Sequence, residues 1–492
     1  MRRGWVAGFV LVAAIGVVAV LPVQGEAGSD AAARERLAGD LAAEVRGADW
    51  GEAARDQVLV GVEVVDLASG ETLHATRAER ALNPASNAKL LAMAAALGVL
   101  GADFTITTSL LGAVDGDAVQ GDVVLRGRGD PTLTAADLWQ LARDARARGI
   151  MRVTGGIAID DSYFGDGPLP FAFDSQPNED NRFRAPVGAA GIDEDAVAVW
   201  IGPGAAAGDP ARVWAWPEGF LELTNEAQTS AGGGNSLALY ASVGPDARTA
   251  ARVWGRIGVS AAWDSYPRRI DDPLTYAGMM LREALRAAGI AVEGQSIGRG
   301  SAPEGAVTLA KHVSDPLGSW LWKLGKESSN YHAEQTLRIV GAERKGVPGT
   351  AEKGAEAVAE LLAEWGVPTD GLVLRNGSGL FTADEVSPRT LTSLLRAVYL
   401  DATLRPEFLA ALAVAGRDGT LAGRLQGAAT KGLVRAKTGT LAAVSALSGY
   451  VLSSDGRAGY AFSVLVNDLC GRTAVARGLQ DAIVTRLAEE LQ

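Results

Sequence analysis

Hydrophobic positions near the start of the chain predict a strand hairpin followed by a helix. Residues 58–66 are rich in Val, residues 68–70 supply a turn, and residues 71–76 return as a second extended run. Residues 83–86 combine Asn, Pro and Ser in a pattern typical of a helix start. The strong helix formers of residues 89–100 then predict a helix, which Gly101 ends.

The last third of the chain predicts several helices and then a group of strands. Apolar residues at helical spacing predict helices over residues 317–325, 329–340, 350–365, 388–400 and 472–491. Short apolar runs predict strands over residues 433–438, 444–452 and 460–466. The strands follow one another closely, so we expect an antiparallel meander.

The middle of the chain, from about residue 103 to residue 314, has a different character. Turns rich in Gly, Asp and Pro alternate there with short Val, Leu and Ile runs, and only residues 274–288 are clearly helical. Residues 164–184 are rich in Pro, Asp and Asn and predict a long surface loop. This stretch is therefore interpreted as a β-rich insert.

The first residues form a targeting segment. Arg2 and Arg3 precede an uncharged apolar run over residues 4–23, and small residues follow near Ala27. This arrangement predicts a signal peptide over residues 1–27 and an exported, periplasmic or cell-wall-associated protein. An uncleaved membrane anchor is the alternative, because the run is long enough to span a bilayer. No Cys follows the run, which excludes a lipoprotein anchor.

Composition excludes several classes of function. The 492-residue chain has 46 Lys and Arg against 58 Asp and Glu, a net charge of −12 that does not suit a nucleic-acid-binding protein. It has one Cys and three His, so a Cys-based zinc site is excluded and His-based chemistry has few candidates. We expect no metal and no organic cofactor.

Ser86 and Lys89 form the first candidate motif. Residues three apart share one face of a helix, so Lys89 is expected over the Ser86 hydroxyl at the helix start. A desolvated Lys with a lowered pKa can activate a Ser nucleophile. Taken alone, the pair is better explained by a capping Ser and a surface Lys.

Ser328 and Asn330 form the second motif, and residues 437–440 form the third. Ser328 can pass a proton to a leaving amine, and Asn330 can hold a substrate carbonyl, although Ser-x-Asn is also a common helix cap. Lys437 and Thr438 can bind a carboxylate, and Gly439 lets a substrate backbone approach a strand. Each motif is weak by itself, but their order along the chain is informative.

The order Ser-x-x-Lys, Ser-x-Asn, Lys-Thr-Gly resembles that of the penicillin-recognising serine acyl-transferases. The long stretch between the first two motifs is similar to that of D-alanyl-D-alanine carboxypeptidases of peptidase family S13, the class C low-molecular-mass penicillin-binding proteins. Further stretches that are similar to this family lie at residues 84–89, 129–133, 376–380, 416–421 and 436–441. Asn376 replaces a common Asp, and Phe381 and Thr382 replace a Ser and an Arg.

The resemblance implies an α/β penicillin-binding, β-lactamase-like domain, with an antiparallel sheet flanked by helices and a large β-rich insert between the first and second motifs. The expected catalytic domain consists of residues 50–102 and 315–492, and the insert consists of residues 103–314. The expected activity is that of a serine-type D-Ala-D-Ala carboxypeptidase, with possible endopeptidase activity on crosslinks. A catalytically inactive relative that binds the cell wall as a scaffold is the alternative.

The resemblance also implies residue roles. Ser86 attacks the carbonyl of the penultimate D-Ala, Lys89 accepts its proton, and Ser328 relays a proton to the departing D-Ala. The substrate-binding residues are Asn330, Lys437, Thr438, Gly439 and Thr440, and the backbone N–H groups of Ser86 and Thr440 form an oxyanion hole. The implied partners are peptidoglycan stem peptides ending in D-Ala-D-Ala, with β-lactams as covalent inhibitors.

Overall fold

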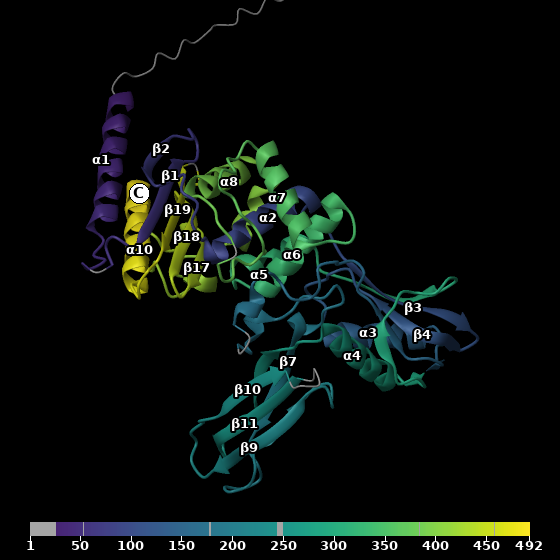
Figure 1. Cartoon of the computed structure of the whole chain (residues 1–492). Helices are drawn as coiled ribbons and strands as arrows, with labels where there is room; N and C mark the ends of the chain where they lie inside the picture. Colours follow the sequence, from purple (N-terminus) through teal and green to yellow (C-terminus); the bar gives the residue numbers. More distant parts are fainter. Residues whose placement is uncertain (1–25, 53, 177–178, 244–248, 383, 457) are drawn as a thin grey trace, which may run out of the picture.

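The computed structural model describes residues 26–52, 54–176, 179–243, 249–382, 384–456 and 458–492 (Figure 1). The predicted signal peptide lies outside these ranges, apart from its last two residues. Within the described ranges, no helix has the length and apolar character needed to cross a membrane.

Strands from both ends of the chain form one antiparallel sheet in the order β16-β17-β18-β19-β1-β2. Its strands are β1 (Leu59–Asp66), β2 (Thr72–Thr76), β16 (Ala413–Val414), β17 (Val434–Leu441), β18 (Val444–Leu452) and β19 (Gly459–Asn467). β1 pairs with β19 in a continuous register from Leu59 opposite Asn467 to Asp66 opposite Tyr460. The predicted hairpin and meander therefore belong to the same sheet.

Helices cover both faces of this sheet, as Figure 1 shows. α1 (Glu26–Gly47) and α10 (Thr473–Glu490) pack on one face. On the other face lie α2 (Ala88–Leu100), α5 (Leu317–Gly325), α6 (Asn330–Lys345), α7 (Ala351–Glu364), α8 (Pro388–Leu400) and α9 (Arg405–Ala411). Successive strand residues point to opposite faces, so Leu447 enters one core and Ala446 the other. Burial on both faces explains why β18 and β19 are almost continuously apolar.

The insert contains a seven-stranded sheet and two three-stranded sheets among the described residues. The larger sheet consists of β3 (Thr107–Asp115), β4 (Ala118–Arg126), β5 (Arg152–Val153), β6 (Ile157–Asp160), β13 (Ala291–Val292), β14 (Ile297–Arg299) and β15 (Val307–Val313). One smaller sheet has the order β12 (Asp264–Arg269), β7 (Ala196–Gly202), β8 (Arg212–Ala215). The other has the order β10 (Ala238–Val243), β11 (Thr249–Gly258), β9 (Glu222–Ser230) and forms the lobe at the bottom of Figure 1.

One expectation for the insert is wrong, namely that residues 274–288 form its one clear helix. It contains a second helix, α3 (Ala135–Ala147), beside the predicted one, α4 (Pro273–Ala287). The side chain of Asp137 caps the start of α3 by accepting hydrogen bonds from the backbone N–H and hydroxyl of Thr134, at 2.8 and 2.6 Å. The apolar side of α3 then packs into the insert core.

The segment over residues 164–184 is irregular and mostly exposed, as the predicted surface loop requires, but a few of its side chains are buried. It contains two short 3-10 helices, η2 (Phe173–Ser175) and η3 (Arg182–Arg184), and the side chains of Phe173 and Arg184 are buried. The Arg184 guanidinium donates to backbone carbonyls within the segment. These interactions satisfy the buried charge within the segment. The Phe183 carbonyl accepts from Asn330 Nδ2 at 2.8 Å, which joins the segment to α6.

Candidate active site

The first motif lies where the short 3-10 helix η1 (Ala85–Asn87) leads into α2. Ser86 is half-buried at this junction, and Lys89 is completely buried in the first turn of α2. The Lys89 ammonium lies 3.1 Å from Ser86 Oγ, 2.7 Å from Asn330 Oδ1 and 2.6 Å from the carbonyl oxygen of Ser378. Lys89 is therefore not the surface Lys of the alternative interpretation.

The second motif lies at the start of α6 and meets both other motifs. The side-chain oxygen of Asn330 accepts the hydrogen bond from Lys89, and its Nδ2 donates to the Phe183 carbonyl at 2.8 Å. Ser328 has a left-handed backbone (φ 61°), and its hydroxyl accepts from Lys437 Nζ at 2.8 Å. An amide oxygen and an amide nitrogen each have capacity for a second hydrogen bond, so Asn330 can still bind a ligand.

The third motif lies on β17, directly beside η1. The Lys437 side chain is buried and also donates to the Thr438 carbonyl, while the Thr438 hydroxyl bonds to that of Thr420. A Cβ at Gly439 would lie 2.8 Å from the Pro84 carbonyl oxygen. The absence of a side chain at Gly439 thus lets the segment that leads into η1 approach the strand, whereas the sequence predicted room for a substrate backbone.

The structure brings all three motifs to one place. Lys89 links Ser86 to Asn330, Lys437 links Ser328 to β17, and η1 packs on β17. Thr440 follows Gly439 on the same strand and is exposed. The eight residues singled out in the sequence therefore surround one site.

Burial controls the charge of the two lysines. Burial lowers the pKa of Lys89 to about 7, although the nearby Glu334 and Asp384 carboxylates oppose this shift. The pKa of Lys437 is also lowered, first by burial and then by the positive charge of Lys89. A substantial share of Lys89 is thus neutral near pH 7, as a proton acceptor must be.

Several residues that hold the site together were not among the sequence candidates. Glu334 is fully buried on α6 and accepts from the Ser378 backbone N–H at 2.9 Å, so it fixes the carbonyl that binds Lys89. With its amide oriented to satisfy both neighbours, Asn87 donates to the Lys437 carbonyl at 2.8 Å. Ser378 and Thr420 lie in stretches that were noted only as similar to the family.

His332 is a buried packing residue beside the second motif. Its side chain is 2% exposed, and its Nδ1 lies 3.0 Å from the Ser329 hydroxyl. Burial lowers the pKa of His332 to about 3. The ring therefore stays neutral at ordinary pH and makes no ion pair there.

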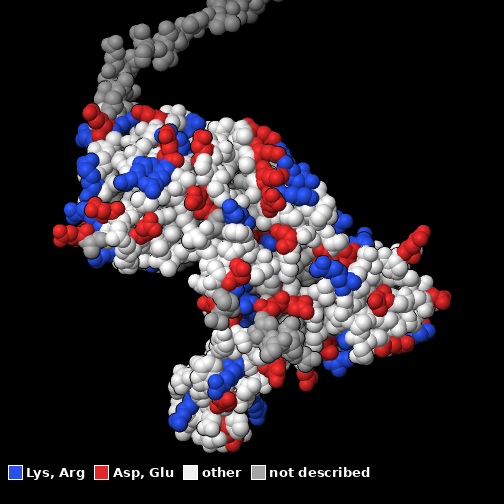
Figure 2. All heavy atoms as spheres, in the orientation of Figure 1, with Lys and Arg blue, Asp and Glu red and all other residues white. Residues whose placement is uncertain are grey.

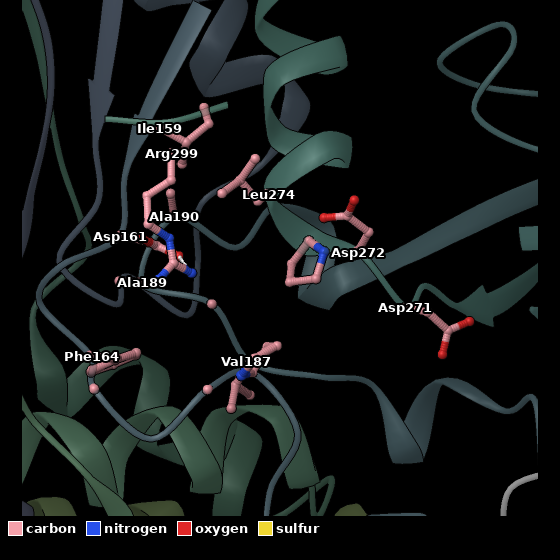
Figure 3. Close-up of a pocket in the computed structure, with 15 residues that line it drawn as sticks. Ile159, Asp161, Phe164, Val187, Ala189, Ala190, Asp271, Asp272, Leu274 and Arg299 are labelled. Carbon is pink, nitrogen blue, oxygen red and sulfur yellow. Dashed lines mark hydrogen bonds and ion pairs between the residues drawn. The ribbon is translucent and has the colours of Figure 1, made fainter. Parts of the chain in front are cut away.

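A separate cavity of about 340 Å³ is lined by residues of the insert (Figure 3). In the close-up, Arg299 and Asp161 point toward each other, and their charged groups are 2.8 Å apart. Asp272 lies across the cavity at the start of α4. None of the eight site residues lines this cavity, so it is distinct from the site described above.

Comparison with known proteins agrees with the site geometry. The D-Ala-D-Ala carboxypeptidase 3 (S13) family model matches residues 48–490. The chain is 38% identical over 458 residues to a D-alanyl-D-alanine carboxypeptidase of Actinomadura sp. (strain R39), covering 89% of this chain and 82% of that protein. It is 30% identical over 463 residues to carboxypeptidase DacB of Mycolicibacterium smegmatis, covering 90% and 82%.

A solved structure has the same fold. Penicillin-binding protein 4 of Haemophilus influenzae superposes with a TM-score of 0.71 at 23% identity, covering 88% of this chain and 98% of that chain. This match confirms the predicted α/β penicillin-binding fold with an antiparallel sheet flanked by helices. From these comparisons, the chain belongs to the S13 family of serine-type D-Ala-D-Ala carboxypeptidases.

Proposed function

We propose that the protein removes the terminal D-Ala from peptidoglycan stem peptides through an acyl-enzyme on Ser86. The observation that carries this proposal is the set of partners around Lys89. Two of its three partners, the Asn330 side-chain oxygen and the Ser378 carbonyl, can only accept hydrogen bonds. A neutral Lys89 donates to these two, which leaves its lone pair for the proton of the Ser86 hydroxyl.

The reaction then proceeds in two steps. Ser86 Oγ attacks the carbonyl carbon of the penultimate D-Ala while its proton passes to Lys89 Nζ, and the oxyanion lies against the backbone N–H groups of Ser86 and Thr440. The C–N bond breaks, and the departing amine takes the proton of Lys89 through the Ser328 hydroxyl, which leaves Lys89 neutral again. Water then attacks the Ser86 ester and gives a proton to Lys89, which passes it to the departing Ser86 Oγ as the shortened peptide is released.

Substrate binding is assigned to the second and third motifs. The Lys437 ammonium, with the hydroxyls of Thr438 and Thr440, receives the terminal carboxylate of the peptide, and Gly439 lies between them on β17. Asn330 orients the peptide amide with its remaining hydrogen-bond capacity. A β-lactam presents a carboxylate and a strained amide in a similar arrangement, so it acylates Ser86 and remains as a slowly hydrolysed ester. The Haemophilus influenzae relative has been solved in complex with a β-lactam.

Export is part of the proposal. The basic and apolar residues of positions 1–27 act as a signal peptide and deliver the protein to the periplasm or cell wall, where its substrate lies. Mass spectrometry of the protein recovered from outside the cytoplasm is expected to show a new N-terminus near residue 28. Recovery of the complete chain from the membrane fraction would instead indicate an anchor.

Labelling with a fluorescent penicillin tests the nucleophile. Wild type is expected to be labelled, and Ser86→Ala is expected to show no label while keeping the wild-type thermal unfolding curve. Ser69→Ala, in an exposed turn, is the matched control and is expected to label normally. Equal labelling of Ser86→Ala and wild type would remove Ser86 from the mechanism. No labelling of any protein, together with no D-Ala release, would favour an inactive scaffold.

A further inference from the structure

The insert carries a cleft of about 570 Å³ with aromatic walls. It lies outside the catalytic residues, between α3, α4 and the sheet β12-β7-β8. We name it the tryptophan cleft and define it by its lining residues, which are Ala135, Trp139, Arg182, Asp193, Ala196, Ala198, Trp200, Trp214, Trp216, Pro267, Tyr276 and Met280. Its volume lies in the range of cavities that bind small organic ligands.

The sheet face that forms the floor of this cleft is apolar although it is open. Val197 and Val199 point from β7 into the insert core, so Ala196, Ala198 and Trp200 point to the other side. Trp214 and Pro267 pair with Trp200 and Ala198, which places them on that same face. An antiparallel sheet with one open face normally carries polar residues there. An apolar open face therefore indicates a binding surface.

The exposed tryptophans supply flat surfaces in fixed positions. The Trp200 and Trp214 rings lie 5.8 Å apart, and their planes differ by 9°. Their side chains are 36% and 45% exposed, and Trp139 on α3, also lining the cleft, is 41% exposed. Burial of a large aromatic ring contributes favourable free energy, and these exposed rings would gain it only when a ligand covers them. The ligand is thus expected to present a flat apolar surface.

The charges of the cleft favour a ligand that is mostly uncharged. Arg182 and Asp193 are the only charged residues among its lining residues, and their charges are opposite. The remaining lining residues are uncharged, and four of them are tryptophans. A pyranose chain has this chemistry, because its rings present apolar C–H faces to the negative faces of indoles and carry hydroxyl and acetamide groups at their edges.

Residues that line the tryptophan cleft are direct chain neighbours of residues that contact the active site. Arg182 precedes Phe183, whose carbonyl accepts from Asn330. Asp193 precedes Glu194, whose carboxylate accepts from the Ser329 hydroxyl at 3.4 Å. At two points, a cleft residue is therefore the chain neighbour of a residue that contacts the second motif.

We infer that the tryptophan cleft binds the glycan strand of peptidoglycan, a β-1,4-linked chain of N-acetylated hexosamines. This inference rests on the proposed function, since a stem peptide is attached to that strand. A strand held in the cleft would keep its stem peptide beside the second motif. The cleft would thus act on polymeric substrate and have little effect on a free peptide.

Direct binding to a soluble sugar is the first test. The full-length protein is titrated with a β-1,4-linked N-acetylglucosamine tetramer, and binding is followed by calorimetry. Trp200→Ala and Trp139→Ala, which lie on a strand and on a helix, are each expected to weaken binding by about tenfold. Trp254→Ala is the matched control, because Trp254 is 39% exposed on β11 outside the cleft. It is expected to bind as wild type does.

Activity on two substrates is the second test. The two cleft variants are expected to release D-Ala from a short soluble peptide at the wild-type rate, but from intact peptidoglycan several times more slowly. If both cleft variants bind the sugar as tightly as wild type does, the cleft assignment is overturned. The same conclusion follows if the variants keep sugar binding and lose self-association or binding to a proline-rich peptide instead. Inactivity of the wild type on the short peptide would overturn the proposed function instead, and the binding data would stand independently.

Discussion

At the residue scale, the proposed role of Lys89 as proton acceptor determines the expected pH dependence of acylation. Its pKa is lowered to about 7, and only the neutral amine accepts the Ser86 proton. The acylation rate is therefore expected to rise with pH and to reach half of its maximum near pH 7. Stopped-flow measurements with a penicillin between about pH 5 and about pH 9 check this. Lys89→Ala is expected to abolish acylation and leave the fold intact, and a rate that falls with pH would contradict the assignment.

Glu334 is a positioning residue for Lys89. Its negative charge opposes the lowering of the Lys89 pKa, and its oxygen holds the Ser378 backbone. Glu334→Gln keeps an oxygen acceptor but removes the charge. The midpoint of the acylation profile is therefore expected to move to lower pH. Glu334→Ala also removes the acceptor, and its maximal rate is expected to fall as well.

Glu334→Gln is also expected to lower the stability of the fold. Arg338 is 1% exposed and lies 3.6 Å from Glu334. Once Glu334 is neutral, Asp166 is the one charged partner of Arg338 among the residues that the structure describes. We expect thermal unfolding to show a loss of about 1–3 kcal/mol. A lower stability with an unchanged pH midpoint would indicate that Glu334 stabilises the fold without acting on Lys89.

At the scale of elements, the loop over residues 376–380 positions η1 by direct backbone contact. Gly379 has a φ of 73°, and a Cβ there would lie 1.8 Å from the Ala85 carbonyl oxygen. Gly379→Ala must therefore displace the residue before Ser86, and we expect a loss of about 1–3 kcal/mol with an acylation rate reduced by at least about tenfold. Gly478→Ala is the control, because Gly478 is exposed within α10 with open space around it. It is expected to stabilise the protein by about 1 kcal/mol. Equal effects of Gly379→Ala and Gly478→Ala on stability and acylation rate would contradict the role of Gly379.

The elements that the sequence predicts well are those with a local cause. α5, α8 and β18 have the expected bounds, because apolar spacing determines them and Pro316, Gly325 and Pro388 mark ends of the two helices. α3 was missed among turn-rich neighbours, although Thr134 and Asp137 form a recognisable cap. The contact between Lys89 and the Ser378 carbonyl could not be predicted, since a backbone carbonyl has no side-chain signature and its position depends on tertiary packing.

At the scale of the whole molecule, charge is evenly distributed over the visible surface. Figure 2 shows Lys and Arg side chains interspersed with Asp and Glu side chains on this face. With a net charge of −12, this pattern offers no broad basic surface on the face shown for a polyanion. Substrate recognition is therefore expected to depend on the clefts of the protein and not on a broad charged surface.

The distribution of the cores predicts how the chain divides on folding. The insert core contains residues between Leu110 and Ala310 only, whereas the core on the helical face of the six-stranded sheet joins residues before and after the insert. We propose that residues 103–314 fold alone and unfold cooperatively on heating, as far-ultraviolet circular dichroism would show. Residues 315–492 alone lack β1, β2 and α2, so their core is open and they are expected to remain aggregated or partly unfolded. Cooperative unfolding of the fragment 315–492 would contradict this division, and so would the absence of cooperative unfolding in the fragment 103–314.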